Sequence, residues 1–144
     1  MRELPRQLSA GELAALFSGR TRLVDELAGR ENPLDVAEEV ALALPEDDQV
    51  AALATHPRIG EPSEEQRGAE PEVLAELERL NEEYERRFGF SFVVFVNGRT
   101  RAELVPVLRE RLARTHDEEL ETGLRALCEI ARARWEQQGW TRTT

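Results

Sequence analysis

The sequence predicts an all-α fold, a single-domain helical bundle with an irregular extended segment near residues 90–97. Apolar residues recur every three or four positions along most of the chain, which is the spacing of one helix face. Helix-starting residues precede several of these runs. Only one run has the aromatic and β-branched composition of a strand, so it has no second strand to pair with. No linker or repeat divides the chain, so we expect residues 1–144 to form one domain.

The first helices are indicated by local start and stop signals. Ser9 and Glu12 have the spacing of a capping box, and Gly19 would end the first helix. Asn32 and Pro33 supply a cap and a first-turn proline for the third helix. The expected ranges, in chain order, are 9–19, 20–29, 34–44, 46–55, 71–88, 101–114 and 117–138.

The later helices follow the same logic. Pro45 precedes an acidic first turn, where the helix dipole favours negative charge. Pro71 starts a long amphipathic helix whose apolar side includes Tyr84. Thr100 can cap the next helix, in which Pro106 predicts a bend or a break. The last helix carries apolar residues at helical spacing, namely Leu120, Leu124, Leu127, Ile130, Ala131 and Trp135.

The extended segment is FGFSFVVFVNGRTR, residues 88–101, which ends in a turn at Asn97 and Gly98. An extended strand without a partner leaves backbone N–H and C=O groups that need hydrogen bonds when they are buried. Two interpretations remain open. Either the segment is a buried connector that bonds to helix ends and water, or its backbone groups face a ligand.

Composition and charge exclude several classes of protein. The net charge of −10 argues against nucleic acid and against anionic membrane surfaces. No apolar run approaches the roughly 20 residues that span a bilayer, and the N-terminus lacks the apolar core of a signal peptide. Cys128 is the only cysteine, so a reducing, cytoplasmic location is expected.

The chain contains no lysine, because all 19 basic residues are arginine. This excludes Schiff-base chemistry, pyridoxal phosphate held on a lysine, and a Walker phosphate loop. Two distant histidines and one cysteine, without an HExxH or CxxC motif, give no metal site of usual spacing. We therefore expect no metal and no cofactor.

Taken singly, the polar candidates have ordinary explanations. His56 follows the apolar run VAALAT and precedes Pro57, so it lies at a helix end, where it is either a cap or a proton-transfer group. The run at 63–66 reads as a helix start. The pattern around Arg134 indicates a helix-surface arginine, and the pattern around His116 indicates part of a helix cap.

Their order along the chain carries a resemblance. HPRIG is followed by SEEQ, then by LNEEYERRFGFSFVVFVNGRTRAELVPVLRERL, then by IARARW. Between about residues 50 and 136 this series resembles the 2-oxo-4-hydroxy-4-carboxy-5-ureidoimidazoline (OHCU) decarboxylase family. The family forms (S)-allantoin in urate degradation, a branch of purine metabolism. The helical N-terminal part is compatible with the resemblance.

The resemblance implies a carboxy-lyase with three catalytic residues: His56 for proton transfer, with Glu65 and Arg134. Two positions depart from the common family pattern, since Ser91 replaces proline and Pro62 replaces serine. The implied substrate-binding residues are Pro57, Pro62, Ser63, Glu64, Glu65, Gln66, Phe92, Val93, Val94, Phe95 and Val96.

The implied reaction needs no cofactor, because a C=N group beside the carboxylate-bearing carbon can accept the electron pair. Histidine suits proton transfer near neutral pH. Glu65 can accept ureido N–H groups, Arg134 can clamp an oxygen with its planar fork, and the backbone of Phe92–Val96 can bind the substrate ring. The implied partner is this small molecule, and a homodimer is what relatives suggest.

Two other functions remain open. An enzyme of the same fold acting on a related ureido compound would keep His56 and change the groups around Glu65 and Phe92–Val96. A non-catalytic acidic helical interaction module would instead show a contiguous exposed apolar stripe and no enclosed pocket at His56.

Overall fold

The computed structural model describes residues 5–56 and 71–142. All regular structure in these two ranges is helical, so the predicted all-α class is confirmed. The helices are α1 (Ala10–Phe17), α2 (Arg22–Leu27), α3 (Pro33–Ala43), α4 (Glu46–Ala54), α5 (Pro71–Phe88), α6 (Arg101–Leu112) and α7 (His116–Arg142).

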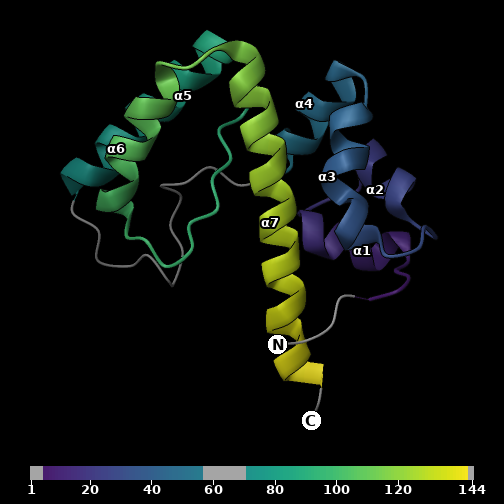
Figure 1. Ribbon diagram of the computed structural model, residues 1–144. Coiled ribbons are helices and arrows are strands. Elements are labelled where there is room, and N and C mark those ends of the chain that lie inside the picture. The colour runs from purple at the N-terminus through teal and green to yellow at the C-terminus, as the bar shows by residue number, and fades with distance from the viewer. Residues whose placement is uncertain (1–4, 57–70, 143–144) are drawn as a thin grey trace.

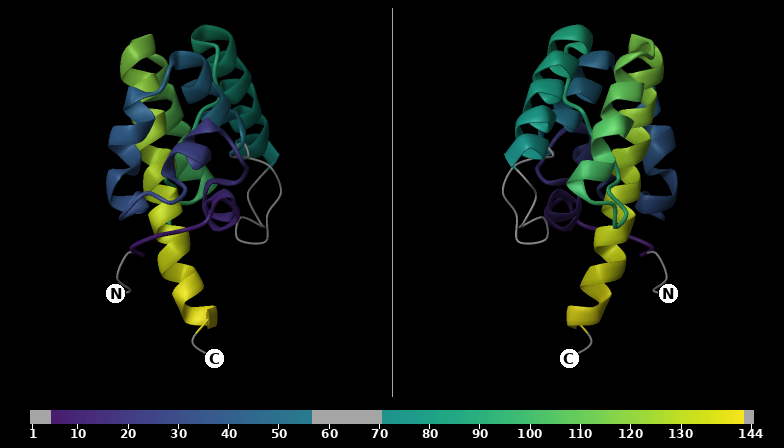
Figure 2. Two further views of the ribbon diagram at one scale, coloured as in Figure 1. Left: turned by 90° about the vertical axis from the view of Figure 1, so that its right-hand side faces the viewer. Right: turned by 90° about the vertical axis from the view of Figure 1, so that its left-hand side faces the viewer.

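The long helix α7 runs through the middle of the molecule and divides it into two halves (Figure 1). On one side it contacts α1, α3 and α4, while α5 and α6 pack against each other on the other side. Its C-terminal end projects beyond the other helices, as both views of Figure 2 show. Leu124, Leu127 and Ala131 of α7 are buried in the core.

Two capping boxes are present, one predicted at Ser9 and Glu12 and one at Thr100, which was predicted only as a cap. The Ser9 hydroxyl accepts from the Glu12 N–H at 3.2 Å, and the Glu12 carboxylate accepts from the Ser9 N–H at 3.1 Å. Thr100 and Glu103 make the same pair of bonds at 3.2 and 2.9 Å. Each box satisfies two N–H groups that the first helical turn leaves without a partner, which stabilises the helix start.

Two local predictions need correction. Helix α1 ends at Phe17, and Ser18 rather than Gly19 takes the left-handed conformation that closes it, with φ 68°. Of the bend or break expected at Pro106, the break is wrong, because α6 continues through this residue to Leu112. The carbonyl that this proline leaves without an N–H partner belongs to Ala102, which is exposed and can bond to water.

The extended segment between α5 and α6 pairs with no strand in the described ranges, and Phe92, Val93 and Val94 within it are buried. It runs back alongside α5, where the Phe92 ring lies 5.1 Å from the Tyr84 ring, edge to face. Arginine side chains donate to three of its carbonyls, those of Val93, Phe95 and Val96. The connector interpretation, which expected bonds to helix ends, was therefore wrong about these three carbonyls.

The described helices can be compared in length and composition with a membrane-spanning helix. None of them combines the length and the apolar composition needed to span a bilayer.

Candidate active site

His56 lies just beyond the C-terminal end of α4. Its backbone N–H donates to the Leu53 carbonyl at 3.2 Å, which continues the helical turn by one residue. The hydroxyl of the preceding Thr55 bonds to the Ala52 carbonyl at 2.8 Å and to the Phe17 carbonyl at 3.2 Å. The second bond ties the end of α4 to the end of α1 and so fixes the backbone that presents His56.

The imidazole of His56 is largely withdrawn from water. Its Nδ1 atom is buried and has no hydrogen-bond partner among the residues that the structure describes. Burial, and then the positive charge of Arg134, together lower the pKa of His56 from 6.5 to about 4. His56 is therefore neutral at pH 7 and has one buried ring nitrogen whose hydrogen-bonding capacity no described residue uses.

Arg134 comes from α7 and reaches the C-terminal end of α1. Its Nη1 donates to the Leu16 carbonyl at 2.9 Å and to the Ser18 hydroxyl at 2.6 Å. Burial lowers the pKa of Arg134, because the charged form loses solvation. No carboxylate pairs with Arg134 within residues 5–56 and 71–142. Among the described residues, its side chain is thus held by a carbonyl and a hydroxyl, both neutral acceptors.

The ends of α1 and α4 therefore meet the side of α7, and this meeting brings His56 and Arg134 together from distant parts of the sequence. A neutral imidazole beside an arginine without a counter-charge can accept a proton while the arginine binds an anion.

The segment Phe92–Val96 lies in the other half of the molecule, with α5 and α6. No hydrogen bond or ion pair in the described part of the chain joins it to His56 or Arg134. The remaining predicted site residues lie outside the described residues, and their roles stay predictions: Pro57, Pro62, Ser63, Glu64, Glu65 and Gln66.

A buried ionic cluster around Glu119, which the sequence reasoning missed, joins α5, α6 and α7. Glu119 is fully buried and accepts from the Tyr84 hydroxyl at 2.7 Å, from Arg111 Nε at 2.7 Å and from Arg114 Nη1 at 2.9 Å. Burial, and then the hydrogen bond to Glu119, raise the pKa of Tyr84. The available signal was spacing, since Arg111 follows Leu104 and Leu108 on the buried side of α6.

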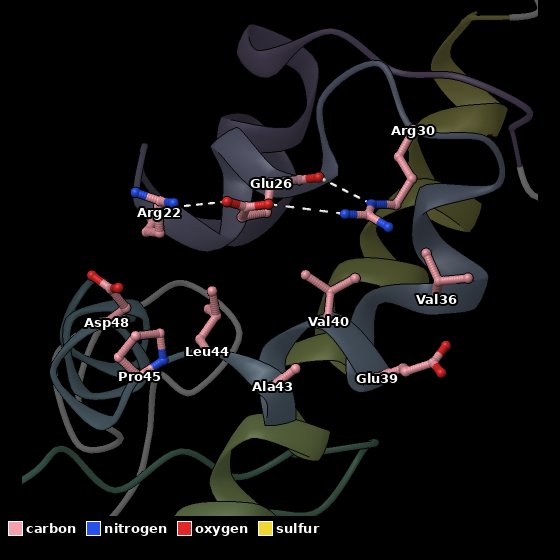
Figure 3. Close-up of a pocket in the computed structure, with 10 residues that line it drawn as sticks. All are labelled: Arg22, Glu26, Arg30, Val36, Glu39, Val40, Ala43, Leu44, Pro45 and Asp48. Atoms are coloured by element: carbon pink, nitrogen blue, oxygen red, sulfur yellow. Dashed lines mark hydrogen bonds and ion pairs between the residues drawn. The ribbon is translucent and has the colours of Figure 1, made fainter.

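A surface pocket of about 600 Å³ lies between α2, α3 and α4 (Figure 3). Val40 and Leu44 contribute apolar lining, and Glu26 holds both Arg22 and Arg30 at its rim. Neither His56 nor Arg134 lines this pocket, so it is separate from the candidate active site. No group of three His, Cys, Asp or Glu side chains that could hold a metal occurs in the part of the chain described.

Comparison with known families and proteins gives consistent matches. The family model described as OHCU decarboxylase matches residues 6–136. A uric acid degradation bifunctional protein of Bacillus sp. (strain TB-90) is 28% identical over 111 residues, covering 69% of this chain. The match covers 22% of that protein, so this chain spans about a fifth of its curated relative.

Two solved structures share the fold. One is OHCU decarboxylase in the presence of (S)-allantoin, with a TM-score of 0.76 and 23% identity over 88% of this chain and 96% of that one. The other is (S)-allantoin synthase, with a TM-score of 0.69 and 18% identity over 87% of this chain and 47% of that one. The bundle of seven described helices is thus the fold of these enzymes.

Proposed function

Because the chain belongs to the OHCU decarboxylase family, we propose that it decarboxylates 2-oxo-4-hydroxy-4-carboxy-5-ureidoimidazoline to (S)-allantoin in urate degradation. His56 is the proton-transfer residue of this proposal. One observation supports this proposal most directly. A neutral His56, whose Nδ1 has no hydrogen-bond partner among the described residues, lies near Arg134, which forms no ion pair with a carboxylate among them.

The chemistry follows from the state of these two groups. When the carbon–carboxylate bond breaks, carbon dioxide leaves and the electron pair of that bond forms a C=C bond to the carbon of the adjacent C=N group. The C=N electron pair moves to the nitrogen, which takes a proton from water. The enol that results becomes allantoin when its hydroxyl loses a proton and the neighbouring carbon gains one. A neutral His56 can accept the proton of this hydroxyl, and the imidazolium it becomes can return a proton to carbon.

The other roles are proposed by position in the family. Arg134 binds a substrate oxygen through its Nε and Nη2 atoms. Neither atom makes a hydrogen bond within the described residues. Glu65 accepts ureido N–H groups, with Pro57, Pro62, Ser63, Glu64 and Gln66 around it. The backbone of Phe92–Val96 binds the planar ring, and the buried side chains of this segment exclude water.

We propose further that residues 1–144 act as one OHCU decarboxylase-like domain, as a homodimer, in the cytoplasm and without a cofactor. Cys128 is buried and unpaired, and burial raises the pKa of its thiol to about 12. An unpaired thiol of this kind suits a reducing compartment.

The decisive experiment mixes the protein with freshly generated substrate and follows (S)-allantoin by circular dichroism. We expect (S)-allantoin to appear faster than in the spontaneous reaction, at a rate unchanged by dialysis against a chelator. A panel of related ureido compounds tests the same-fold alternative. Turnover of one of those compounds in place of this substrate, or turnover of none, would overturn the proposal.

A further inference from the structure

Arg111 is a buried arginine that bridges the ionic cluster to the extended segment. Its side chain is 8% exposed. Its Nε donates to the fully buried Glu119 at 2.7 Å, and its Nη1 donates to the Val93 carbonyl at 2.8 Å. Its guanidinium carbon lies 4.5 Å from the centre of the Phe92 ring, within range of a cation–π contact. One side chain therefore holds both the backbone and a side chain of this segment.

The position of Arg111 is itself fixed from two other helices. Glu119 of α7 accepts from it and also from Tyr84 of α5, whose ring packs against the Phe92 ring. The segment has no strand partner in the described part of the chain, so side-chain bonds such as this one hold its backbone in place.

We propose that Arg111 is a positioning residue for substrate binding, which fixes the backbone of Phe92–Val96 through the Val93 carbonyl and the Phe92 ring. The inference rests on the proposed function, in which this segment binds the substrate ring. Arg111 itself need not touch the substrate. Its effect passes through the geometry of the segment.

Arg111→Lys is the informative substitution. Lysine keeps the positive charge opposite Glu119, but it lacks the planar fork that bonds Glu119 and Val93 at the same time. Arg114→Lys is the matched control, because Arg114 bonds the other oxygen of the same carboxylate and also Thr122. In the described part of the chain its side chain makes no hydrogen bond with the segment. Both variants perturb the cluster, but only one loses the bond to Val93.

Steady-state kinetics separate positioning from general structural damage. We expect Arg111→Lys to raise KM, and the Kd of allantoin, by roughly tenfold or more, the factor for losing one bond to a charged group, with kcat within a few-fold. Arg114→Lys should leave KM within about twofold. An unchanged KM in Arg111→Lys, or an equal rise in both variants, would overturn the proposal.

Hydrogen exchange gives a readout that does not depend on the reaction. The amides of residues 92–96 should exchange faster in Arg111→Lys than in wild type and in Arg114→Lys, while helical amides of α1 and α3 stay the same. If Arg111→Lys does not fold, Glu119→Gln loosens the same arginine with an isosteric side chain and should shift KM and exchange in the same direction. Unchanged exchange in the folded variant means that Arg111 does not hold the segment.

The two proposals fail in different ways. A wild-type protein that neither decarboxylates the substrate nor binds allantoin removes the proposed function, while exchange still decides whether Arg111 fixes the segment. An active wild-type enzyme with normal KM and normal exchange in Arg111→Lys and Glu119→Gln removes only the positioning role.

Discussion

Arg111 and Arg134 lie in opposite halves of the molecule and differ in what balances their charge. Arg111, with α5 and α6, pairs with Glu119, which is fully buried and also held by Tyr84 and Arg114. Arg134, beside α1 and α4, donates only to a carbonyl and a hydroxyl within the described residues. Within the described residues a carboxylate therefore balances the charge of Arg111, and none balances the charge of Arg134.

The difference separates a structural charge from one available to a ligand. Burying a charge costs free energy unless a partner compensates it, so a paired buried arginine is largely committed to its partner. An arginine that is partly withdrawn from water, without a carboxylate, gains from an anion that arrives later. The neutral His56 beside Arg134 fits the same interpretation, since a neutral imidazole adds no second positive charge there.

The largest expected effect lies in the half that contains Arg134. His56→Asn should fold normally and bind allantoin, yet lose about 10²–10⁴-fold in kcat, the usual contribution of a general acid–base group. His116→Asn is the matched control, because His116 contacts Phe90 and Asp117 far from Arg134. Stopped-flow circular dichroism measures both. Activity of His56→Asn within a few-fold of wild type would remove His56 from the mechanism.

The next prediction concerns stability in the half of the molecule that contains Arg111. Glu119→Ala leaves Arg111 buried without its carboxylate and should lower the free energy of unfolding by about 3–5 kcal/mol. Ser18→Ala removes an acceptor from Arg134 in the other half and should cost only about 1 kcal/mol. Urea denaturation of both variants compares the halves directly. Equal losses would show that the two arginines depend on their partners to the same extent.

A smaller effect concerns affinity. Arg134→Lys keeps the charge but loses the planar fork, so allantoin should bind roughly tenfold to a hundredfold more weakly, with little loss of stability. Arg132→Lys changes the same helix two residues earlier, where the side chain bonds the Leu34 carbonyl and Glu38. Calorimetry should find its affinity within about twofold of wild type. If Arg134→Lys also binds like wild type, Arg134 is not a ligand-binding residue.

What the sequence could predict depends on how local each feature is. The capping boxes at Ser9 and Thr100 were predictable, because they involve residues three apart. That Ser18 ends α1 in a left-handed conformation was not predictable. The hydroxyl of Ser18 accepts a hydrogen bond from Arg134, which lies more than a hundred positions later in the sequence.

The candidate site divides in the same way. His56 could be placed at a helix end from Pro57 and the apolar run before it. Its approach to Arg134 came only from the family resemblance, because it depends on how α1, α4 and α7 pack. The pairing of Arg111 with Glu119 joins two helices, so spacing could indicate that Arg111 is buried and could not name its partner.

The smallest expected effect is a pH dependence of stability that belongs to the His56 half. The pKa of His56 is about 4 in the folded protein and near 6.5 when unfolded, so the unfolded state takes up the proton first as pH falls. The stability that the neutral residue contributes is therefore fully present above about pH 6.5 and is lost as pH falls toward 4. Between about pH 7.5 and 5 this amounts to up to about 2 kcal/mol. Urea unfolding across this range should show a steeper loss for wild type than for His56→Gln, while His116→Gln keeps the wild-type slope. Parallel profiles for wild type and His56→Gln would mean that His56 is not withdrawn from water, and the contrast between the two halves would then rest on the arginines alone.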